Sequence, residues 1–227
     1  MFNTILKPFN AEIKNLLNTH IIGVDILIDN SSLNLENFNL KELEHYINSK
    51  KGIFNASCLC TNEELTFRLY LKTLFNLKNK DTFSINLTII PCGNYSGTIH
   101  FIPYLTKDIV KETSPGLNTP SIVSKDISSK GAYMCFIDNE SVLTYAMKCE
   151  VYEGDFKKTS FNTEKSDPNK LSYSLKAKSL AGTPVMLNKY CSLIKGSIGC
   201  EDDLNKRALD LVKKSCIKGF DNIKRGW

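Results

Sequence analysis

An alternation of apolar and polar residues from Leu143 to Tyr152 most constrains the fold of this chain. Side chains that alternate in this way are typical of a half-buried β-strand. Gly154 and Asp155 break the run, and a second alternating run covers residues 171–178, after turn residues at 166–169. We therefore expect two long antiparallel strands in a β-sheet unit that mediates interactions and does not act as a catalytic loop.

The length of the chain, 227 residues, allows one large domain or one core domain with appendages. Hydrophobic residues make up 42% and charged residues 23%, which suffices for a buried core in a globular protein. No run approaches the roughly 18 apolar residues that span a bilayer. The first eight residues have no basic start and no apolar stretch. We therefore expect no signal peptide and no membrane partner.

The net charge of +5 makes the chain mildly basic, with a pI near 8.7. Its 29 basic residues include only three arginines, whereas nucleic-acid recognition favours the fixed donors of arginine. Basic residues gather between Lys206 and Arg225 without an interleaved aromatic platform. We interpret this stretch as the solvated face of a helix, and a basic accessory protein that binds nucleic acid stays an alternative.

Three of the eight cysteines, Cys191, Cys200 and Cys216, lie close together in the last quarter of the sequence. Their spacings match no zinc-binding framework. Without export, cysteines stay reduced, and a reduced cysteine commonly packs as a small buried hydrophobe. We therefore predict no metal site and no cofactor, and retain these three residues as the candidate ligands if a metal is bound.

A Cys92–His100 pair is a conceivable nucleophile and base, because a turn could bring their two strands together. No third group is evident to orient the pair, and no family signature surrounds Cys92. Asp25, within an apolar strand, is explained by an edge or solvent-facing position. We therefore expect no catalysis, and a small cysteine-dependent enzyme stays the first alternative, ahead of the nucleic-acid-binding protein.

Periodicity and end signals predict a β-rich middle between helical ends. Helices are predicted at residues 9–20, at 40–49 after the cap Asn39, at 62–78, and from Glu201 onward. Thr61 and Glu64 have the spacing of a capping box before the helix at 62–78. Residues 111–131 are predicted to form a long polar loop. Strands are predicted at 21–28, 53–60, 83–90, 98–105, 132–137 and 142–152.

Residues 142–180 resemble a sequence pattern found in tail-tube and baseplate proteins of phages. The pattern consists of a glycine, a hydrophobic residue, a short strand, an Asp-Pro turn, here at 167–168, and a Tyr-Ser strand. The resemblance implies a β-sandwich or barrel, with six subunits closing a ring around a channel. It implies that Lys176 and Lys178 face the lumen or a neighbouring subunit. It assigns six residues to the core and assembly strands: Leu143, Tyr145, Met147, Leu171, Tyr173 and Leu175.

Together these observations predict an α+β protein with an antiparallel β-barrel or sandwich core and helices at both ends. The predicted parts are a helical and strand appendage at 1–52, a β-rich core domain at 53–190 and a C-terminal helical extension at 191–227. The basic charge and the helical first 80 residues depart from a simple tube subunit. They shift the expectation towards a specialised ring or baseplate component.

The function that the resemblance implies is structural. The chain would form a homo-oligomer, dock to other proteins of a virion or phage tail, contact DNA in passage, and perform no catalysis. It would be assembled in the host cytoplasm and reside in the virion. Exposed strand edges and a long polar loop are the features expected to mediate this assembly.

Overall fold

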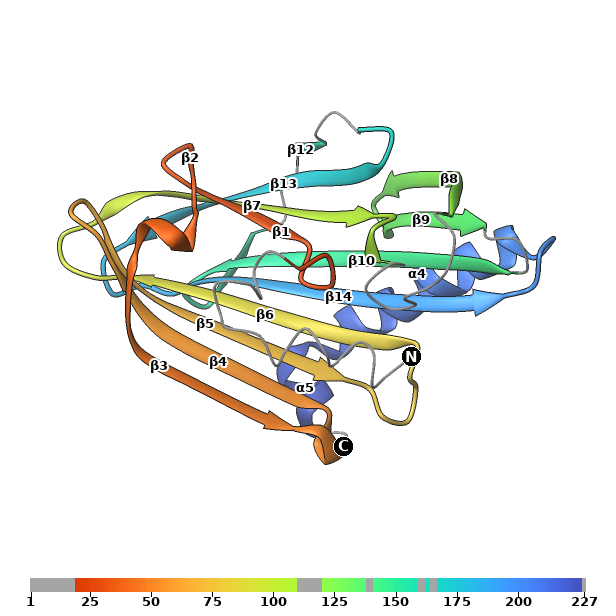
Figure 1. Ribbon diagram of the computed structural model, residues 1–227, viewed down its shortest axis with the longest axis horizontal. Coiled ribbons are helices and arrows are strands. Elements are labelled where there is room, and N and C mark those ends of the chain that lie inside the picture. Colours follow the sequence, from red (N-terminus) through yellow and green to blue (C-terminus); the bar gives the residue numbers. More distant parts are fainter. Residues whose placement is uncertain (1–18, 110–119, 138–140, 159–161, 164–166, 226–227) are drawn as a thin grey trace.

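The computed structural model describes residues 19–109, 120–137, 141–158, 162–163 and 167–225. Within these ranges the chain forms two antiparallel β-sheets packed face to face, with a helix outside the larger sheet (Figure 1). Strands that alternate between apolar and polar residues produce this layering, because each strand presents its apolar side chains to one face only.

The smaller sheet has the strand order β12-β13-β7-β1-β2. β7 pairs with β1 on one side and with β13 on the other. Asp29 and Asn30 have φ angles of 48° and 69° in the turn between β1 and β2, as a tight two-residue hairpin requires. The strands are β1 (Val24–Ile28), β2 (Ser31–Ser32), β7 (Ser96–Thr106), β12 (Asn162–Thr163) and β13 (Lys170–Leu180).

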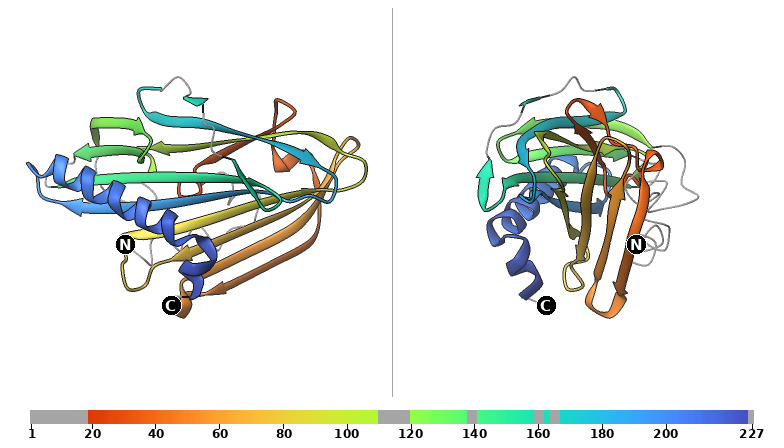
Figure 2. Two further views of the ribbon diagram at one scale, coloured as in Figure 1. Left: turned by 180° about the vertical axis from the view of Figure 1, so that it is seen from behind. Right: turned by 90° about the vertical axis from the view of Figure 1, so that its left-hand side faces the viewer.

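The larger sheet has the order β3-β4-β5-β6-β14-β10-β9-β8, and β11 also pairs with β10. β14 (Val185–Gly196) inserts between β6 and β10, so a late part of the sequence completes the centre of this sheet. Figure 2 shows the sheet curling, so that β3–β5 stand at an angle to β10. The other strands are β3 (Asn39–Asn48), β4 (Ile53–Thr61), β5 (Thr66–Phe75), β6 (Thr82–Pro91), β8 (Ser121–Ser128), β9 (Gly131–Ile137), β10 (Val142–Glu153) and β11 (Phe156–Lys158).

The main hydrophobic core fills the space between the two sheets. In β5, for example, Phe67, Leu69 and Leu71 are buried, while the residues between them face the other side of the sheet. Phe101 from the smaller sheet and Tyr145 from the larger sheet are fully buried. Each large side chain buried in this way contributes about 1.5–3 kcal/mol, so the core dominates the stability of the sandwich.

Helices α4 (Glu201–Lys218) and α5 (Phe220–Arg225) cover part of the outer face of the larger sheet (Figure 2). Three acidic residues in the first turn of α4 complement the helix dipole. Both helices in the described ranges are too short or too polar to cross a membrane. The predicted C-terminal helix is confirmed, and its buried residues recur at helical spacing: Leu204, Ala208 and Val212.

The helices predicted at 40–49 and 62–78 are wrong, because these segments form β3 and β5. The side-chain oxygen of Asn62 accepts hydrogen bonds from the backbone N–H groups of Glu64 and Leu65, at 3.0 and 2.7 Å. This arrangement closes a turn between β4 and β5, and it replaces the predicted capping box. Strand pairing on both sides of β5 then overrides the helical periodicity of its leucines.

The predicted strands at 53–60, 83–90, 98–105, 132–137 and 142–152 are confirmed to within one or two residues at each end. The predicted loop at 111–131 is wrong in part, because residues 121–128 form β8. The helix predicted at 9–20 lies almost wholly outside the described residues. In the described ranges the two sheets are not closed into a barrel, and both α-helices lie at the C-terminal end. The architecture is therefore a mostly antiparallel β-sandwich.

The division into parts at 1–52, 53–190 and 191–227 stays a prediction. β14 continues across residue 190 to Gly196 as a central strand. β3, which precedes residue 53, pairs along its length with β4. The boundary after residue 190 therefore lies within β14, and the boundary after residue 52 lies in the connection between two paired strands of the same sheet.

Candidate functional site

The six residues assigned to core and assembly strands lie on β10 and β13, which belong to opposite sheets. Five of them are buried, and Leu143 is half-buried against the same core. Their packing between the sheets stabilises the sandwich, and their predicted role in assembly stays a prediction. The five buried residues are Tyr145, Met147, Leu171, Tyr173 and Leu175.

The three candidate metal ligands have different surroundings. Cys191 is buried in the core, where it accepts a hydrogen bond from the hydroxyl of Tyr145 at 3.8 Å. Cys200 is exposed at the start of α4, and Cys216 lies on α4 with its thiol donating to Glu150. Among the described residues, no group of three or more His, Cys, Asp or Glu side chains could hold a metal ion.

Cys92 and His100 belong to different sheets. Cys92 directly follows β6 in the larger sheet, and its thiol contacts the carbonyl of Ile90 at 3.7 Å. His100 lies in β7 of the smaller sheet, opposite Leu27 and Lys176. The turn between β6 and β7 therefore connects the two layers and does not align these residues as neighbours. Asp25 faces solvent, as expected, and forms an ion pair with Lys170 at 2.6 Å.

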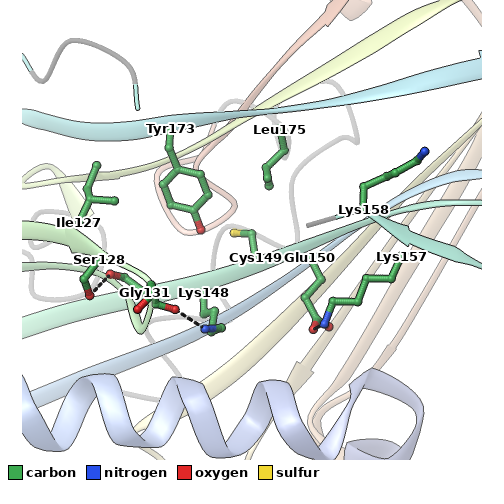
Figure 3. Close-up of a pocket in the computed structure, with 11 residues that line it drawn as sticks. Ile127, Ser128, Gly131, Lys148, Cys149, Glu150, Lys157, Lys158, Tyr173 and Leu175 are labelled. Carbon is green, nitrogen blue, oxygen red and sulfur yellow. Dashed lines mark hydrogen bonds and ion pairs between the residues drawn. The ribbon is translucent and has the colours of Figure 1, made fainter. Parts of the chain in front are cut away.

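A small pocket of about 210 Å³ lies beside β10, at the point where its pairing with β9 ends and its pairing with β11 begins (Figure 3). Cys149 points from β10 towards Tyr173 of the smaller sheet, whereas Glu150 points to the opposite side, towards α4. Burial raises the pKa of Cys149 to about 12, so its thiol stays protonated at neutral pH. A protonated thiol is a poor nucleophile, so the pocket does not present an activated cysteine.

Glu150 is the centre of a buried polar cluster beneath α4. Its side chain is only 6% exposed and forms an ion pair with Lys157. It also accepts hydrogen bonds from the hydroxyls of Tyr152 and Tyr190 at 3.1 and 3.2 Å, and from the thiol of Cys216 at 3.2 Å. Burial raises the pKa of Glu150, but these donors and the charge of Lys157 outweigh that effect and lower it. Glu150 is therefore an ionised carboxylate with both oxygens occupied.

Two adjoining hollows lie on the outer face of the larger sheet, with volumes of about 850 and 420 Å³. Lys72 and Asn86 line both, and we call the two together the outer-face hollow. Side chains of the larger part come from β3, β4 and β5: Glu44, Tyr46, Asn55, Ser57 and Tyr70. The smaller part reaches α5 and includes Tyr152, Asp155, Met186, Asn188 and Asp221.

The strand register explains why polar residues gather in the outer-face hollow. Directly opposite residues of neighbouring antiparallel strands share one face of a sheet. The pairing of β3, β4, β5, β6 and β14 therefore places one row of side chains across the hollow: Tyr46, Asn55, Lys72, Asn86 and Asn188. Within this row the amide of Asn86 donates to the side-chain oxygen of Asn188 at 2.8 Å.

The fold is similar to part of several solved structures. A protein assigned as a kojibiose phosphorylase from the human microbiome matches with a TM-score of 0.72 and 11% identity, over 89% of this chain and 26% of its own. Heparinase III matches with a TM-score of 0.45 and 14% identity, over 77% of this chain and 24% of its own. This chain thus spans about a quarter of their length. The first of these similarities supports the β-sandwich fold.

A family profile described as glycosyl hydrolase family 65, N-terminal domain, matches residues 8–226, and no curated protein matches. This match overturns the resemblance to phage tail-tube and baseplate proteins, and with it the predicted structural role in a virion and the predicted location there. The expectation that the protein has no connection with catalysis is wrong in the same way, because the matching profile describes the N-terminal domain of a glycosyl hydrolase family. The chain belongs to the family of glycosyl hydrolase family 65 N-terminal domains.

Proposed function

We propose that this chain contributes saccharide recognition to a carbohydrate-processing enzyme. The observation that supports this most strongly is the family match, which extends over residues 8–226. The similarity to an assigned kojibiose phosphorylase is consistent with it, although that similarity by itself concerns the fold. The predicted self-association of the chain stays a prediction.

The geometry favours recognition over bond cleavage by the buried carboxylate. A glycosidase acid needs a protonated carboxyl with a raised pKa, placed across the bond from a second carboxylate. Glu150 has a lowered pKa and is turned towards α4 with both oxygens bonded. Its role is to join β10, β11 and α4. The outer-face hollow, in contrast, is open and has a volume in the range of ligand sites.

Saturation-transfer NMR on the wild-type chain tests this proposal. The panel contains kojibiose, maltose, trehalose and a heparin-derived disaccharide at millimolar concentration, with glycerol as the control polyol. We expect saturation transfer to at least one of the disaccharides and none to glycerol. If no saccharide receives saturation, the chain does not recognise carbohydrate and the proposed function is wrong.

A further inference from the structure

We infer that the outer-face hollow binds a neutral oligosaccharide, with sugar rings against Tyr46 and Tyr70 and hydroxyl groups on the amides between them. This inference rests on the proposed function and names its site and ligand class.

Two exposed tyrosines flank the larger part of the hollow. Tyr46 on β3 is 53% exposed and Tyr70 on β5 is 38% exposed. Both share a face with Asn55 and Ser57 of β4, which lies between them. Two strand spacings separate β3 from β5, which is about 10 Å. Tyrosine offers a rigid ring of large contact area at low entropic cost, which suits the C–H face of a sugar.

Amide groups are available where sugar hydroxyls would lie. A hydroxyl both donates and accepts hydrogen bonds, and an asparagine amide can do both in return. The side-chain oxygen of Asn55 is buried and has no hydrogen-bond partner among the residues that the structure describes. The oxygen of Asn86 accepts from Thr88 at 3.0 Å and one of its N–H groups is used by Asn188. The amide of Asn86 has a second N–H, so it can donate once more.

The charges around the hollow favour a neutral ligand. Glu44 and Lys72 contribute opposite charges to the larger part. Asp155 and Asp221 add negative charge to the smaller part. A sulfated saccharide would meet these carboxylates without an excess of cations, which disfavours its binding. From β3 to β14 the row of polar residues spans four strand spacings, or about 19 Å, so the hollow is longer than one sugar ring.

Isothermal titration calorimetry with maltotetraose on matched variants tests the inference. We expect Tyr46→Ala and Tyr70→Ala each to weaken binding roughly three- to tenfold, which corresponds to about 0.7–1.4 kcal/mol, because each removes one ring contact. Tyr70→Phe keeps the ring and should bind within about twofold of the wild type. Leu180→Ala, which removes an exposed apolar side chain of the smaller sheet, is the control. Thermal unfolding verifies that each variant is folded.

The outcomes separate the inference from the proposed function. Weakening by both alanine variants, with Tyr70→Phe and Leu180→Ala unchanged, supports the hollow as the site. Wild-type affinity in the folded double variant Tyr46→Ala, Tyr70→Ala overturns the inference and leaves carbohydrate recognition in place. Binding of a heparin-derived tetrasaccharide without binding of maltotetraose also overturns it, because the ligand class would be wrong. Absence of saccharide binding by the wild type contradicts both.

Discussion

Replacing Lys189 by methionine is expected to destabilise the protein by about 2–4 kcal/mol, because buried backbone carbonyls lose a donor. Lys189 is fully buried, and its ammonium donates to the carbonyls of Ile22, Gly23 and Tyr104 at 2.9, 2.9 and 3.1 Å. The carbonyl of Gly23 also accepts from the backbone N–H of Tyr104, so it keeps a partner in the variant. Urea unfolding measures the change.

Lys195→Met is the matched control, because Lys195 lies on the same strand but is exposed. Its expected effect lies within about 0.5 kcal/mol of zero. Equal stability of the Lys189→Met variant and the wild type would show that the buried ammonium does not tie the segment before β1 to the sandwich.

The same residue predicts a pH dependence with a definite sign. Burial lowers the pKa of Lys189 below that of an exposed lysine, about 10.4. Between the lowered pKa of Lys189 in the folded state and its ordinary pKa in the unfolded chain, the unfolded chain binds more protons at this site than the folded chain. The free energy of unfolding therefore rises with pH in this interval. The stability difference between wild type and Lys189→Met should therefore grow from pH 7 to pH 10. A difference that shrinks over this range would contradict the lowered pKa.

Glu150→Ala is the second substitution with a large expected effect, a loss of about 3 kcal/mol. It removes the acceptor of two tyrosine hydroxyls and a thiol, and the hydroxyl of Tyr190 would remain buried without this partner. Lys157 also loses its ion pair, but its side chain is 47% exposed and can be solvated. Because the cluster joins β10 to α4, we expect the loss to appear as earlier unfolding in urea.

Two further variants serve as comparisons for Glu150→Ala. Glu150→Gln keeps the shape but not the charge, and should lose less than the alanine variant. Asp210→Ala changes an exposed carboxylate on α4 and should have little effect. Because the folded-state pKa of Glu150 is lowered, its contribution is present above the unfolded value of about 4.3 and is lost as pH falls through the folded value. If the wild type stays more stable than Glu150→Ala at a pH below the folded-state pKa of Glu150, the ion pair is not the source of the difference in stability.

Sequence periodicity predicts the strands well where apolar residues alternate strictly, as in β10 and β13. It fails where a leucine-rich segment satisfies helical spacing as well, as in β5, whose pairing with β4 and β6 is non-local information. It also omits β14, because this central strand is buried on both faces over residues 187–194 and its apolar and polar residues do not alternate. The resemblance to phage proteins used only local residues, which many β-hairpins share.

Sequence periodicity also does not reveal the outer-face hollow, because it predicts helices where the structure has β3 and β5. Tyr46 and Tyr70 fell within predicted helices, where they cannot form one surface with Asn55. Read with a period of two, β5 separates its residues into a buried face, with Leu69 and Leu71, and an outer face with Tyr70. That alternation was the available signal. The arrangement across β3, β4 and β6 depends on register, which one sequence does not specify.

Mapping maltotetraose onto the ¹⁵N-labelled protein by NMR tests the central claim, saccharide recognition by this sandwich, most directly. We expect the side-chain amide signals of Asn55 and Asn86 to shift during the titration, together with backbone signals of β3, β4 and β5. Shifts confined to the smaller sheet, or a spectrum unchanged at saturating sugar, would contradict it.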